Sequence, residues 1–333
     1  MEVIHGGFHV VFPMGDASRV GEARRHAMQL AADCGLDDTE SGRLALVVTE
    51  LATNLVRHAQ HGRLLLSSRR ARGEVEVISI DEGPGIADIH RSLGDGYSTG
   101  STPGTGLGAV RRLARRFDLH STVPGGTLIV AQVGGRAAQD ASHLGAVSQA
   151  APGEHVCGDG WAFALEGELT AVMVVDGLGH GPDAAEAAAA ALDVFGQEPF
   201  TPTDILLERI HQRLRSTRGA AVMLLQADAA AGVVRSAGAG NVMARLVSGV
   251  SDRTLLCQNG TAGLTIRTPE EISTPWPPHA LLVVISDGIE SRWKPEVLAP
   301  VLSRDPALAA ALLMRDHCRG RDDATVAVLR RKD

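Results

Sequence analysis

Helical spacing of apolar positions marks two long helices near the start of the chain. Val20, Ala23, Ala27 and Leu30 recur three or four positions apart, which predicts a helix over 16–34. A second helix is predicted over 38–59, with Leu44, Val47, Val48, Leu51 and Leu55 on one side. Asp16 can cap the first helix and Gly35 can close it.

Short apolar runs predict a sheet beside these helices. Strands are predicted over 8–13, 63–68, 74–80, 118–123 and 127–133, the first as an edge strand. A glycine-rich stretch ends in Gly104-Thr105-Gly106-Leu107-Gly108, which opens a third helix predicted to reach about Phe117.

The second half has a different pattern, with continuous apolar runs that end in acidic residues. Such runs are typical of strands buried on both faces of a layered core. Strands are predicted over 161–165, 171–175, 219–227, 232–237, 242–247, 281–285 and 324–329, and helices over 182–195 and 203–215. Small and polar residues at 134–141 predict a linker. We therefore expect an α+β chain of two domains, 1–133 and 142–333.

Composition narrows the class of protein. The 333 residues are 44% hydrophobic and carry a net charge of -7, which predicts a globular chain without general affinity for nucleic acid. The four cysteines show no metal-binding or disulfide spacing, which favours reduced thiols. No basic-then-apolar start and no run of about 20 apolar residues is present. We expect a cytoplasmic protein that binds neither nucleic acid nor membrane.

Candidate chemistry in the first half centres on Asp81-Glu82-Gly83-Pro84-Gly85. A carboxylate followed by glycines suits a flat base, because the acid accepts from an exocyclic amine while backbone approaches the ring. Glu50, Asn54 and His58 share one face of the second helix and can hold Mg²⁺ with its waters, or simply form a polar solvent face. Glycines before a helix start give phosphates access to backbone N–H groups.

Candidate chemistry in the second half is a set of acids at strand ends. Asp159, Asp176, Asp287 and the pair Asp322-Asp323 lie far apart in sequence, and hard cations need oxygen ligands gathered from rigid elements. The set predicts a site for two cations. The competing interpretation for each acid alone is an ordinary Asp-Gly turn.

The first half resembles the GHKL ATPase/kinase superfamily, and within it the anti-sigma-factor serine kinases that act on STAS-domain proteins. The resemblance rests on Glu50-Leu51-Ala52-Thr53-Asn54, Arg57-His58-Ala59, Asp81 to Gly85, Gly104 to Gly108 and Gly126-Thr127, with a short lid at Gly96-Tyr97-Ser98-Thr99. It implies a Bergerat-type α/β sandwich that binds ATP with Mg²⁺. Asn54 would bind Mg²⁺, Asp81 the adenine amine, Gly83 and Gly85 the base, and Thr127 would back the adenine. Gly104, Thr105, Gly106, Leu107 and Gly108 would hold phosphates, and Glu50 would activate the acceptor hydroxyl.

The second half resembles PP2C-type phosphatases, closest to the SpoIIE/RsbX-like branch. The motifs are Gly158-Asp159, Asp176-Gly177-Leu178-Gly179-His180-Gly181, Ser286-Asp287-Gly288 and Asp322-Asp323-Ala324-Thr325. The resemblance implies an α-β-β-α sandwich with two Mn²⁺ or Mg²⁺ ions, bridged by Asp176. Gly177 (by its carbonyl) and Asp159 would lie on one side, and Asp287 with Asp322 or Asp323 on the other. No arginine lies just ahead of Asp159 to clamp the phosphate, where eukaryotic relatives have one. His180 is either a donor to the leaving group or a local hydrogen-bonding residue.

Three functional hypotheses follow from the two resemblances. The first is a bifunctional partner-switching enzyme, kinase and phosphatase, acting on a STAS-domain phosphoprotein. The second keeps the phosphatase but makes the first domain a nucleotide-dependent docking module for a STAS protein, a sigma factor or a larger signalling complex. The third is a pseudoenzyme scaffold. Dimers are common among the anti-sigma kinases that the first half resembles, so a homodimer is one possibility and the sequence leaves the oligomeric state open.

Overall fold

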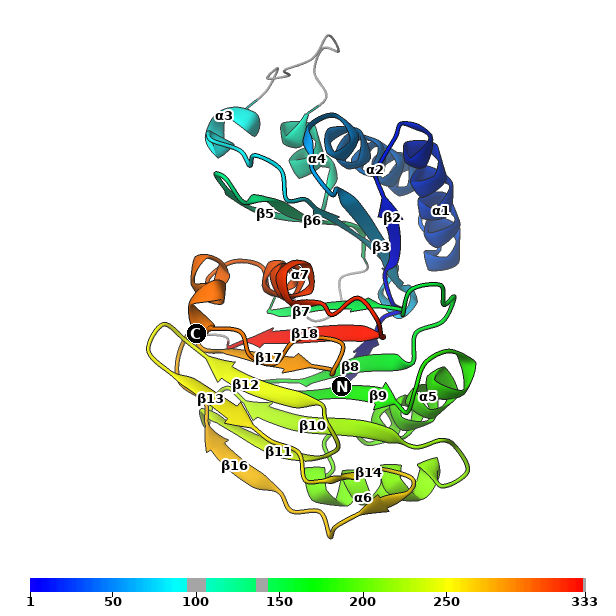
Figure 1. Ribbon diagram of the computed structural model, residues 1–333, viewed down its shortest axis with the longest axis vertical. Helices are drawn as coiled ribbons and strands as arrows, with labels where there is room; N and C mark the ends of the chain where they lie inside the picture. The colour runs from blue at the N-terminus through cyan, green and yellow to red at the C-terminus, as the bar shows by residue number, and fades with distance from the viewer. Residues whose placement is uncertain (95–105, 136–142, 332–333) are drawn as a thin grey trace. The chain divides into compact units, whose positions relative to one another are not determined.

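The computed structural model describes residues 1–94, 106–135 and 143–331, which fall into two compact units (Figure 1). We call residues 9–138 the insert unit, and residues 1–8 with 139–333 the sandwich unit. The α+β class and the two-domain organisation are confirmed. Across the described ranges, no helix combines the length and apolar character that a bilayer crossing demands.

The insert unit is one antiparallel sheet with helices packed on it. The sheet runs in the order β2-β3-β4-β6-β5. Its strands are β2 (Val10–Pro13), β3 (Arg63–Arg69), β4 (Glu74–Ile80), β5 (Arg116–Thr122) and β6 (Gly126–Gly134), and its helices are α1 (Ser18–Cys34), α2 (Asp38–His58), α3 (Ile89–Ser92) and α4 (Leu107–Leu113), with a 3₁₀ turn at Arg70–Arg72. The predicted apolar side of α2 is buried in the core between helices and sheet.

The ends of the two long helices follow from local chemistry. Asp16 accepts hydrogen bonds from the backbone N–H and the hydroxyl of Ser18, and Gly35 closes α1 in the left-handed conformation at φ +66°. Asp37 caps α2 by accepting from the N–H of Glu40 at 2.7 Å. These contacts define where the amphipathic segments begin and end.

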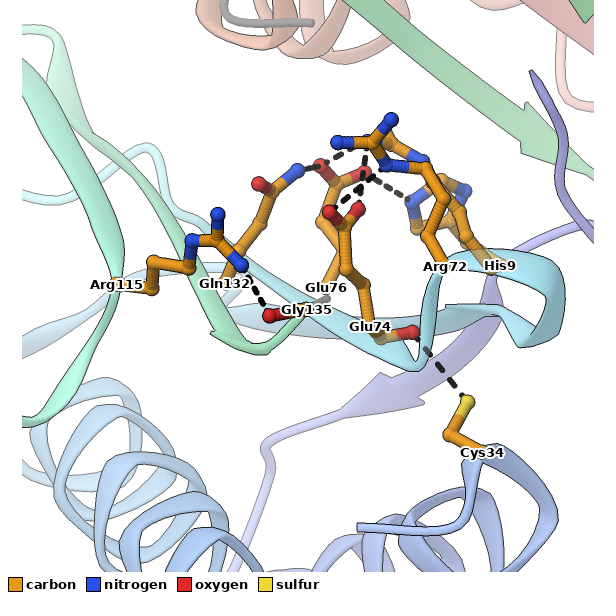
Figure 2. A network of polar contacts seen from close by, with 9 residues as sticks. His9, Cys34, Arg72, Glu74, Glu76, Arg115, Gln132 and Gly135 are labelled. Carbon is orange, nitrogen blue, oxygen red and sulfur yellow. Dashed lines mark hydrogen bonds and ion pairs between the residues drawn. The ribbon is translucent and has the colours of Figure 1, made fainter. Parts of the chain in front are cut away.

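A buried charge network lies on β3 and β4 of the insert unit (Figure 2). Glu76 accepts from Gln132 at 2.7 Å, contacts the His9 ring at 3.3 Å and pairs with Arg69 at 3.2 Å. Burial raises the pKa of Glu76, but Arg69, His9 and Gln132 outweigh it and lower that pKa to about 2. Glu76 is therefore a buried carboxylate that is held in its charged form.

The sandwich unit has two facing sheets with helices outside them. One sheet runs β1-β8-β9-β10-β11-β16 and the other β13-β12-β17-β18-β7, with an apolar core between them. Helices α5 and α6 pack on the first sheet, and α7 packs on β7 and β18 of the second (Figure 1). This is the predicted α-β-β-α sandwich.

The elements of the sandwich unit have the following bounds. Its helices are α5 (Pro182–Gln197), α6 (Thr203–Leu214) and α7 (Pro306–His317), with a 3₁₀ segment at Pro295–Val301. Its strands are β1 (Glu2–His5), β7 (Leu144–Gln149), β8 (Asp159–Glu166), β9 (Leu169–Gly177), β10 (Ala220–Asp228), β11 (Val233–Ala239), β12 (Met243–Val247), β13 (Asp252–Leu255), β14 (Gly260–Thr261), β15 (Thr265–Ile266), β16 (Ile272–Pro275), β17 (Leu281–Ile285) and β18 (Ala324–Arg330).

The first eight residues belong to the sandwich unit, which differs from the predicted first domain of 1–133. Strand β1 pairs antiparallel with β8, Ile4 opposite Phe163, and Ile4 is buried in the sandwich core. The chain thus begins the sandwich, forms the whole insert unit, and then returns to complete the sandwich. The predicted linker, 134–141, lies mostly outside the described residues.

One predicted helix is shorter in the structure than expected. The helix that starts at Leu107 ends at Leu113 instead of about Phe117. Residues from Arg116 onward form β5, in which Arg116 lies opposite Gln132 of β6. Pairing with a buried strand overrides the weak helical pattern of these four residues.

Candidate active sites

The sandwich unit has a cavity of about 350 Å³ at the ends of its buried strands. Acids from three of the four predicted strand ends line it, namely Asp176, Asp287 and Asp322. Backbone and amide groups of the loops after β9, β11 and β13 complete the wall. Segments far apart in the sequence are therefore gathered at one cavity, as the strand-end pattern predicts.

Asp159 and Asp176 lie directly opposite each other on β8 and β9. Burial, and after it the charges of Asp159, Asp287, Asp322 and Asp323, together raise the pKa of Asp176 to about 9. Burial also raises the pKa of Asp159 to about 7, against hydrogen bonds from Ser286 and Thr325 that lower it. Two carboxylates this close repel each other when both are charged.

Hydrogen bonds fix two of the acids in place. Ser286 donates its hydroxyl to Asp159 at 2.6 Å, and its oxygen accepts from the N–H of Thr325 at 2.9 Å. Asn241, in the loop after β11, donates its amide to Asp287 at 2.6 Å. Burial and the charge of Asp322 raise the pKa of Asp287, whereas Arg319 lowers it.

The neighbouring acids Asp322 and Asp323 differ in their surroundings. Asp323 is buried, and its two oxygens accept from the N–H groups of Ala151 at 2.8 Å and Gly158 at 2.9 Å. Asp322 is exposed and lines the cavity. Asp323 therefore holds both ends of the loop between β7 and β8, and Asp322 is the better candidate ligand.

The donor chemistry of the cavity fits hard cations. No group of three or more His, Cys, Asp or Glu side chains, within the described ranges, is set close enough to hold a metal ion. Yet the carboxyl oxygen Oδ1 of Asp159 is buried without a hydrogen-bond partner, and the acids raise one another's pKa. Positive charge would relieve both features, because cations favour the ionised acids and satisfy their oxygens.

His180 has a local partner beside the cavity. Its Nδ1 lies 2.7 Å from the carboxylate of Glu154, and both side chains are partly exposed. This contact agrees with the local hydrogen-bonding role rather than with a donor aimed at a leaving group.

In the insert unit, the predicted base-binding turn follows β4. Asp81 is half-buried, and its carboxylate accepts from the N–H of Gly83 at 2.7 Å. The N–H of Asp81 donates to the carbonyl of Thr127 at 3.0 Å, so these two predicted adenine-site residues adjoin. Thr127 in turn shares a hydroxyl contact of 2.9 Å with Ser121.

The turn needs its glycines. Gly85 has φ +76°, and a Cβ there would lie 2.0 Å from the carbonyl oxygen of Thr122. The N–H of Ile86 donates to the Ser121 hydroxyl at 2.8 Å, which holds the turn against β5. Backbone can therefore come close to whatever the turn binds.

The predicted polar face of α2 ends at this turn. Glu50 and Asn54 are half-buried and His58 is exposed. The carbonyl of Gln60, just past α2, accepts from the N–H of Glu82 at 3.0 Å, which joins the helix end to the turn. Helix α2 also packs against α4, whose start carries Gly106, Leu107 and Gly108. Gly104, Thr105 and the lid at 96–99 lie outside the described residues.

Each of the two units matches a family of known proteins. The family model described as Stage II sporulation protein E (SpoIIE) matches residues 166–332, half of the chain, and a model for a histidine kinase-like ATPase domain matches residues 14–133. The serine/threonine-protein kinase RsbT of Bacillus subtilis (strain 168) is 34% identical over 111 residues, which is 33% of this chain and 84% of that relative. The chain belongs to the SpoIIE family and carries an inserted domain of the RsbT kinase family.

Solved structures support the fold of this SpoIIE-family chain. One, described as "The bacterial stressosome: a modular system that has been adapted to control secondary messenger signaling", is 28% identical, with a TM-score of 0.53 over 56% of this chain and 97% of that one. RsbX in complex with magnesium, at 20% identity and a TM-score of 0.52 over 58% of this chain and 98% of the other, shares the fold. The SpoIIE-family chain thus joins a PP2C-type phosphatase domain to a serine/threonine kinase-type domain.

Sequence reasoning missed some residues at the cavity of this SpoIIE-family protein. Asn241 lies in the loop after β11, where no motif marks it, and contacts an acid 46 positions away. Asn259, just before β14, and Thr261, within β14, also line the cavity. Ser286 is part of the motif Ser286-Asp287-Gly288, but no role was predicted for it, and the structure shows its hydroxyl bound to Asp159.

Proposed function

We propose that the chain is a bifunctional partner-switching regulator. The sandwich unit would be a protein phosphoserine/phosphothreonine phosphatase that depends on Mn²⁺ or Mg²⁺, and the insert unit an ATP-dependent protein serine/threonine kinase. A STAS-domain phosphoprotein would be the substrate of both. The observation that carries the proposal is the cavity where Asp176, Asp287 and Asp322 meet.

In the sandwich unit, Asp159, Asp176, the Gly177 carbonyl, Asp287 and Asp322 would hold two cations. Bound there, the cations would neutralise phosphoryl charge and lower the pKa of a water molecule. Ser286 and Asn241 would keep the carboxylates of Asp159 and Asp287 in one orientation. Asp323 would hold the loop between β7 and β8, through Ala151 and Gly158, beside the site.

In the insert unit, Asp81 would accept from the adenine amine, with Gly83, Gly85 and Thr127 around the base. Asn54 would bind Mg²⁺, and the glycine segment that ends in Gly106, Leu107 and Gly108 would hold phosphates. Glu50 would take the proton of the acceptor hydroxyl. The support is the contact of Asp81 with Thr127 and of the α2 end with the 81–85 turn.

The deciding experiment is intact mass spectrometry of a candidate STAS protein incubated with ATP and Mg²⁺. The chain is supplied as wild type, as Asp176→Asn, or as Asp193→Asn, which alters an exposed acid on α5. We expect one added phosphoryl group to accumulate only with Asp176→Asn, because the other two proteins remove it again.

Other outcomes separate the alternatives. If no variant adds phosphate but wild type removes it from a phosphorylated partner, the insert unit is a nucleotide-dependent docking module. If wild type neither adds nor removes phosphate, the chain is a scaffold and the proposal is wrong.

A further inference from the structure

Every charged side chain among the described lining residues of the cavity in the sandwich unit is acidic. The lining includes three carboxylates and two asparagines, and no lysine or arginine belongs to the described lining residues. The sequence just ahead of Asp159 has no arginine either. A phosphomonoester dianion is bound best by a fixed donor of positive charge, and arginine matches its oxygens with two parallel N–H groups.

One arginine is held at the rim of this cavity. Arg218 lies between α6 and β10, in a loop with several internal hydrogen bonds. The N–H of Thr217 donates to the carbonyl of Leu214 at 2.9 Å, and the Thr217 hydroxyl accepts from the N–H of Gly219 at 3.0 Å. The carbonyl of Gly219 accepts from the N–H of Leu178, a cavity residue, at 3.0 Å. The residue after Arg218 is therefore bonded to the cavity wall, and the residue before it is held within the loop.

The guanidinium of Arg218 reaches the same wall. A Cβ built on Gly179, which lines the cavity, would lie 3.4 Å from Nη1 of Arg218, in van der Waals contact. The guanidinium therefore lies within contact distance of the cavity residue Gly179. The conformation of Gly179, with φ +86°, also favours glycine.

Arg218 has a partner that it can exchange. Its Nη2 pairs with Asp183 at 2.6 Å, and the two side chains are 51% and 61% exposed. Exposed ion pairs contribute about 0–1 kcal/mol, since water and salt screen them. A phosphate dianion at the cavity would compete well for this guanidinium.

We propose that Arg218 is the phosphate-binding residue of the sandwich unit. It leaves Asp183 and donates to the non-bridging oxygens of the substrate phosphoryl group, in place of the arginine missing ahead of Asp159. This inference rests on the proposed phosphatase function and assigns it a substrate contact.

A second arginine, Arg319, is the main competitor for this role. Its charge lowers the pKa of Asp287, and its N–H donates to the carbonyl of Gly288 at 2.8 Å. Arg319 therefore lies near an acid that would hold a cation, where its own charge opposes that cation. The partner of Arg218, Asp183, does not line the cavity, so Arg218 can bind phosphate without disturbing a proposed ligand.

The test is steady-state hydrolysis of p-nitrophenyl phosphate and a phosphoserine peptide with Mn²⁺, with inorganic phosphate as competitive inhibitor. We expect Arg218→Gln to raise KM and the inhibition constant of phosphate roughly tenfold or more, and to change kcat less, since a charged hydrogen bond is lost. Arg218→Lys should recover part of the loss. Arg209→Gln is the matched control, because Arg209 on α6 forms an equally exposed pair with Glu198.

Asp183→Asn separates binding from a structural role of the ion pair. Freed of its partner, Arg218 should bind phosphate more tightly, so KM should fall. If Arg218→Gln and Asp183→Asn change KM in the same direction, the pair is structural and the proposal is wrong. A larger effect of Arg319→Gln than of Arg218→Gln on KM and phosphate inhibition also overturns it.

Calorimetric titration of inorganic phosphate with Mg²⁺ present tests the inference without turnover. Weaker phosphate binding by Arg218→Gln than by wild type is expected even if wild type hydrolyses neither substrate. That pair of results would reject the phosphatase and retain the anion contact. Equal phosphate affinities in an active enzyme would reject Arg218 and retain the phosphatase.

Discussion

Folding of the metal-free protein favours the neutral form of Asp176, whereas the proposed binding of cations needs its charged form. Its pKa in the fold is about 9, raised by burial and then by the neighbouring acids, whereas an unfolded chain has its ordinary value near 3.8. The stability linked to this group is therefore complete below pH 3.8 and is lost as pH rises toward 9. Without cations, the sandwich unit should become less stable across this window.

Asp176→Asn should stabilise the metal-free protein while abolishing phosphatase activity. The amide has no charge to desolvate, so we expect the melting temperature in EDTA at pH 8 to rise by several degrees. Differential scanning calorimetry measures it, with Asp193→Asn as the control for loss of a surface acid. An Asp176→Asn melting temperature at or below that of wild type would contradict this account.

Asp81 allows a parallel prediction in the insert unit. In Asp81→Asn, an amide replaces the carboxylate that would accept from the adenine amine. The amide N–H group would face another donor, so binding of a fluorescent ATP analogue should weaken at least tenfold. Glu82→Gln alters the exposed neighbour and should leave binding unchanged. Equal binding by both variants would place the nucleotide elsewhere.

Glu76 should make the insert unit less stable at acid pH. Its pKa of about 2 lies below the ordinary value of 4.5, so its stabilisation is present above pH 4.5 and is lost as pH falls toward 2. Glu76→Gln should lower stability at pH 7 by about 3 kcal/mol, because Arg69 and His9 lose their buried partner. The difference from wild type should shrink below pH 4.

The effect of Glu76→Gln on stability can be measured through the reactivity of Cys34. This cysteine is buried in the insert unit, and the other three cysteines lie in the sandwich unit. Labelling by a disulfide reagent that reacts in acid, followed by peptide mass spectrometry, reports opening of the insert unit alone. A Glu76→Gln penalty that stays constant from pH 7 to pH 3 would rule out this titration.

At the scale of elements, the sequence predicted long and strongly patterned segments well. Three buried strands lie close to their expected positions at 171–175, 281–285 and 324–329, because a strand buried on both faces needs a continuous apolar run. The helix that begins at Asp38 also lies where its apolar spacing predicts it. The acids at their ends were predicted for the same reason. Asn241 and Arg218 were not, since a loop residue at a cavity carries no periodicity.

Several elements were not predicted, among them α3, β7 and the short strands from β13 to β16, and two of the unpredicted elements, α7 and β1, show different reasons. Helix α7 is apolar on all sides, which hides its period, although Asp305-Pro306 at its start is a capping signal: Asp305 accepts from the N–H of Ala307 at 2.9 Å. Strand β1 has only four residues, and its partner β8 begins more than 150 positions later. Local pattern cannot reveal a pairing of that kind.

Strand β1 should matter to the sandwich unit alone. Ile4→Ala removes a side chain buried in the sandwich core and should cost about 2–4 kcal/mol. Tryptophan fluorescence measures it, because all three tryptophans, Trp161, Trp276 and Trp293, lie in this unit. His5→Ala, on the exposed side of the same strand, is the control. Equal unfolding midpoints for the two variants would argue against the β1–β8 pairing.

At the scale of the whole molecule, the two proposed ligands should stabilise different units. At a concentration one hundred times its dissociation constant, Mn²⁺ should stabilise the sandwich unit by about 2.7 kcal/mol. The melting temperature followed by tryptophan fluorescence should rise accordingly, and a chelator should reverse the shift. ATP with Mg²⁺ should slow labelling of Cys34. A non-hydrolysable ATP analogue in Mn²⁺-saturated protein should leave the tryptophan transition unchanged; a shift would show that the units unfold together.

The position of β1 also determines the order in which a ribosome can complete the phosphatase. Strand β1 is made first, but its partner β8 emerges only after the entire insert unit, a wait on the order of ten seconds at ordinary rates of translation. The kinase-type domain can fold during that interval, while the first strand stays unpaired. A shortened gene that starts after the insert would leave the edge of β8 open to pairing with other chains. A fragment that begins after the insert unit would therefore lack one edge strand of the phosphatase domain.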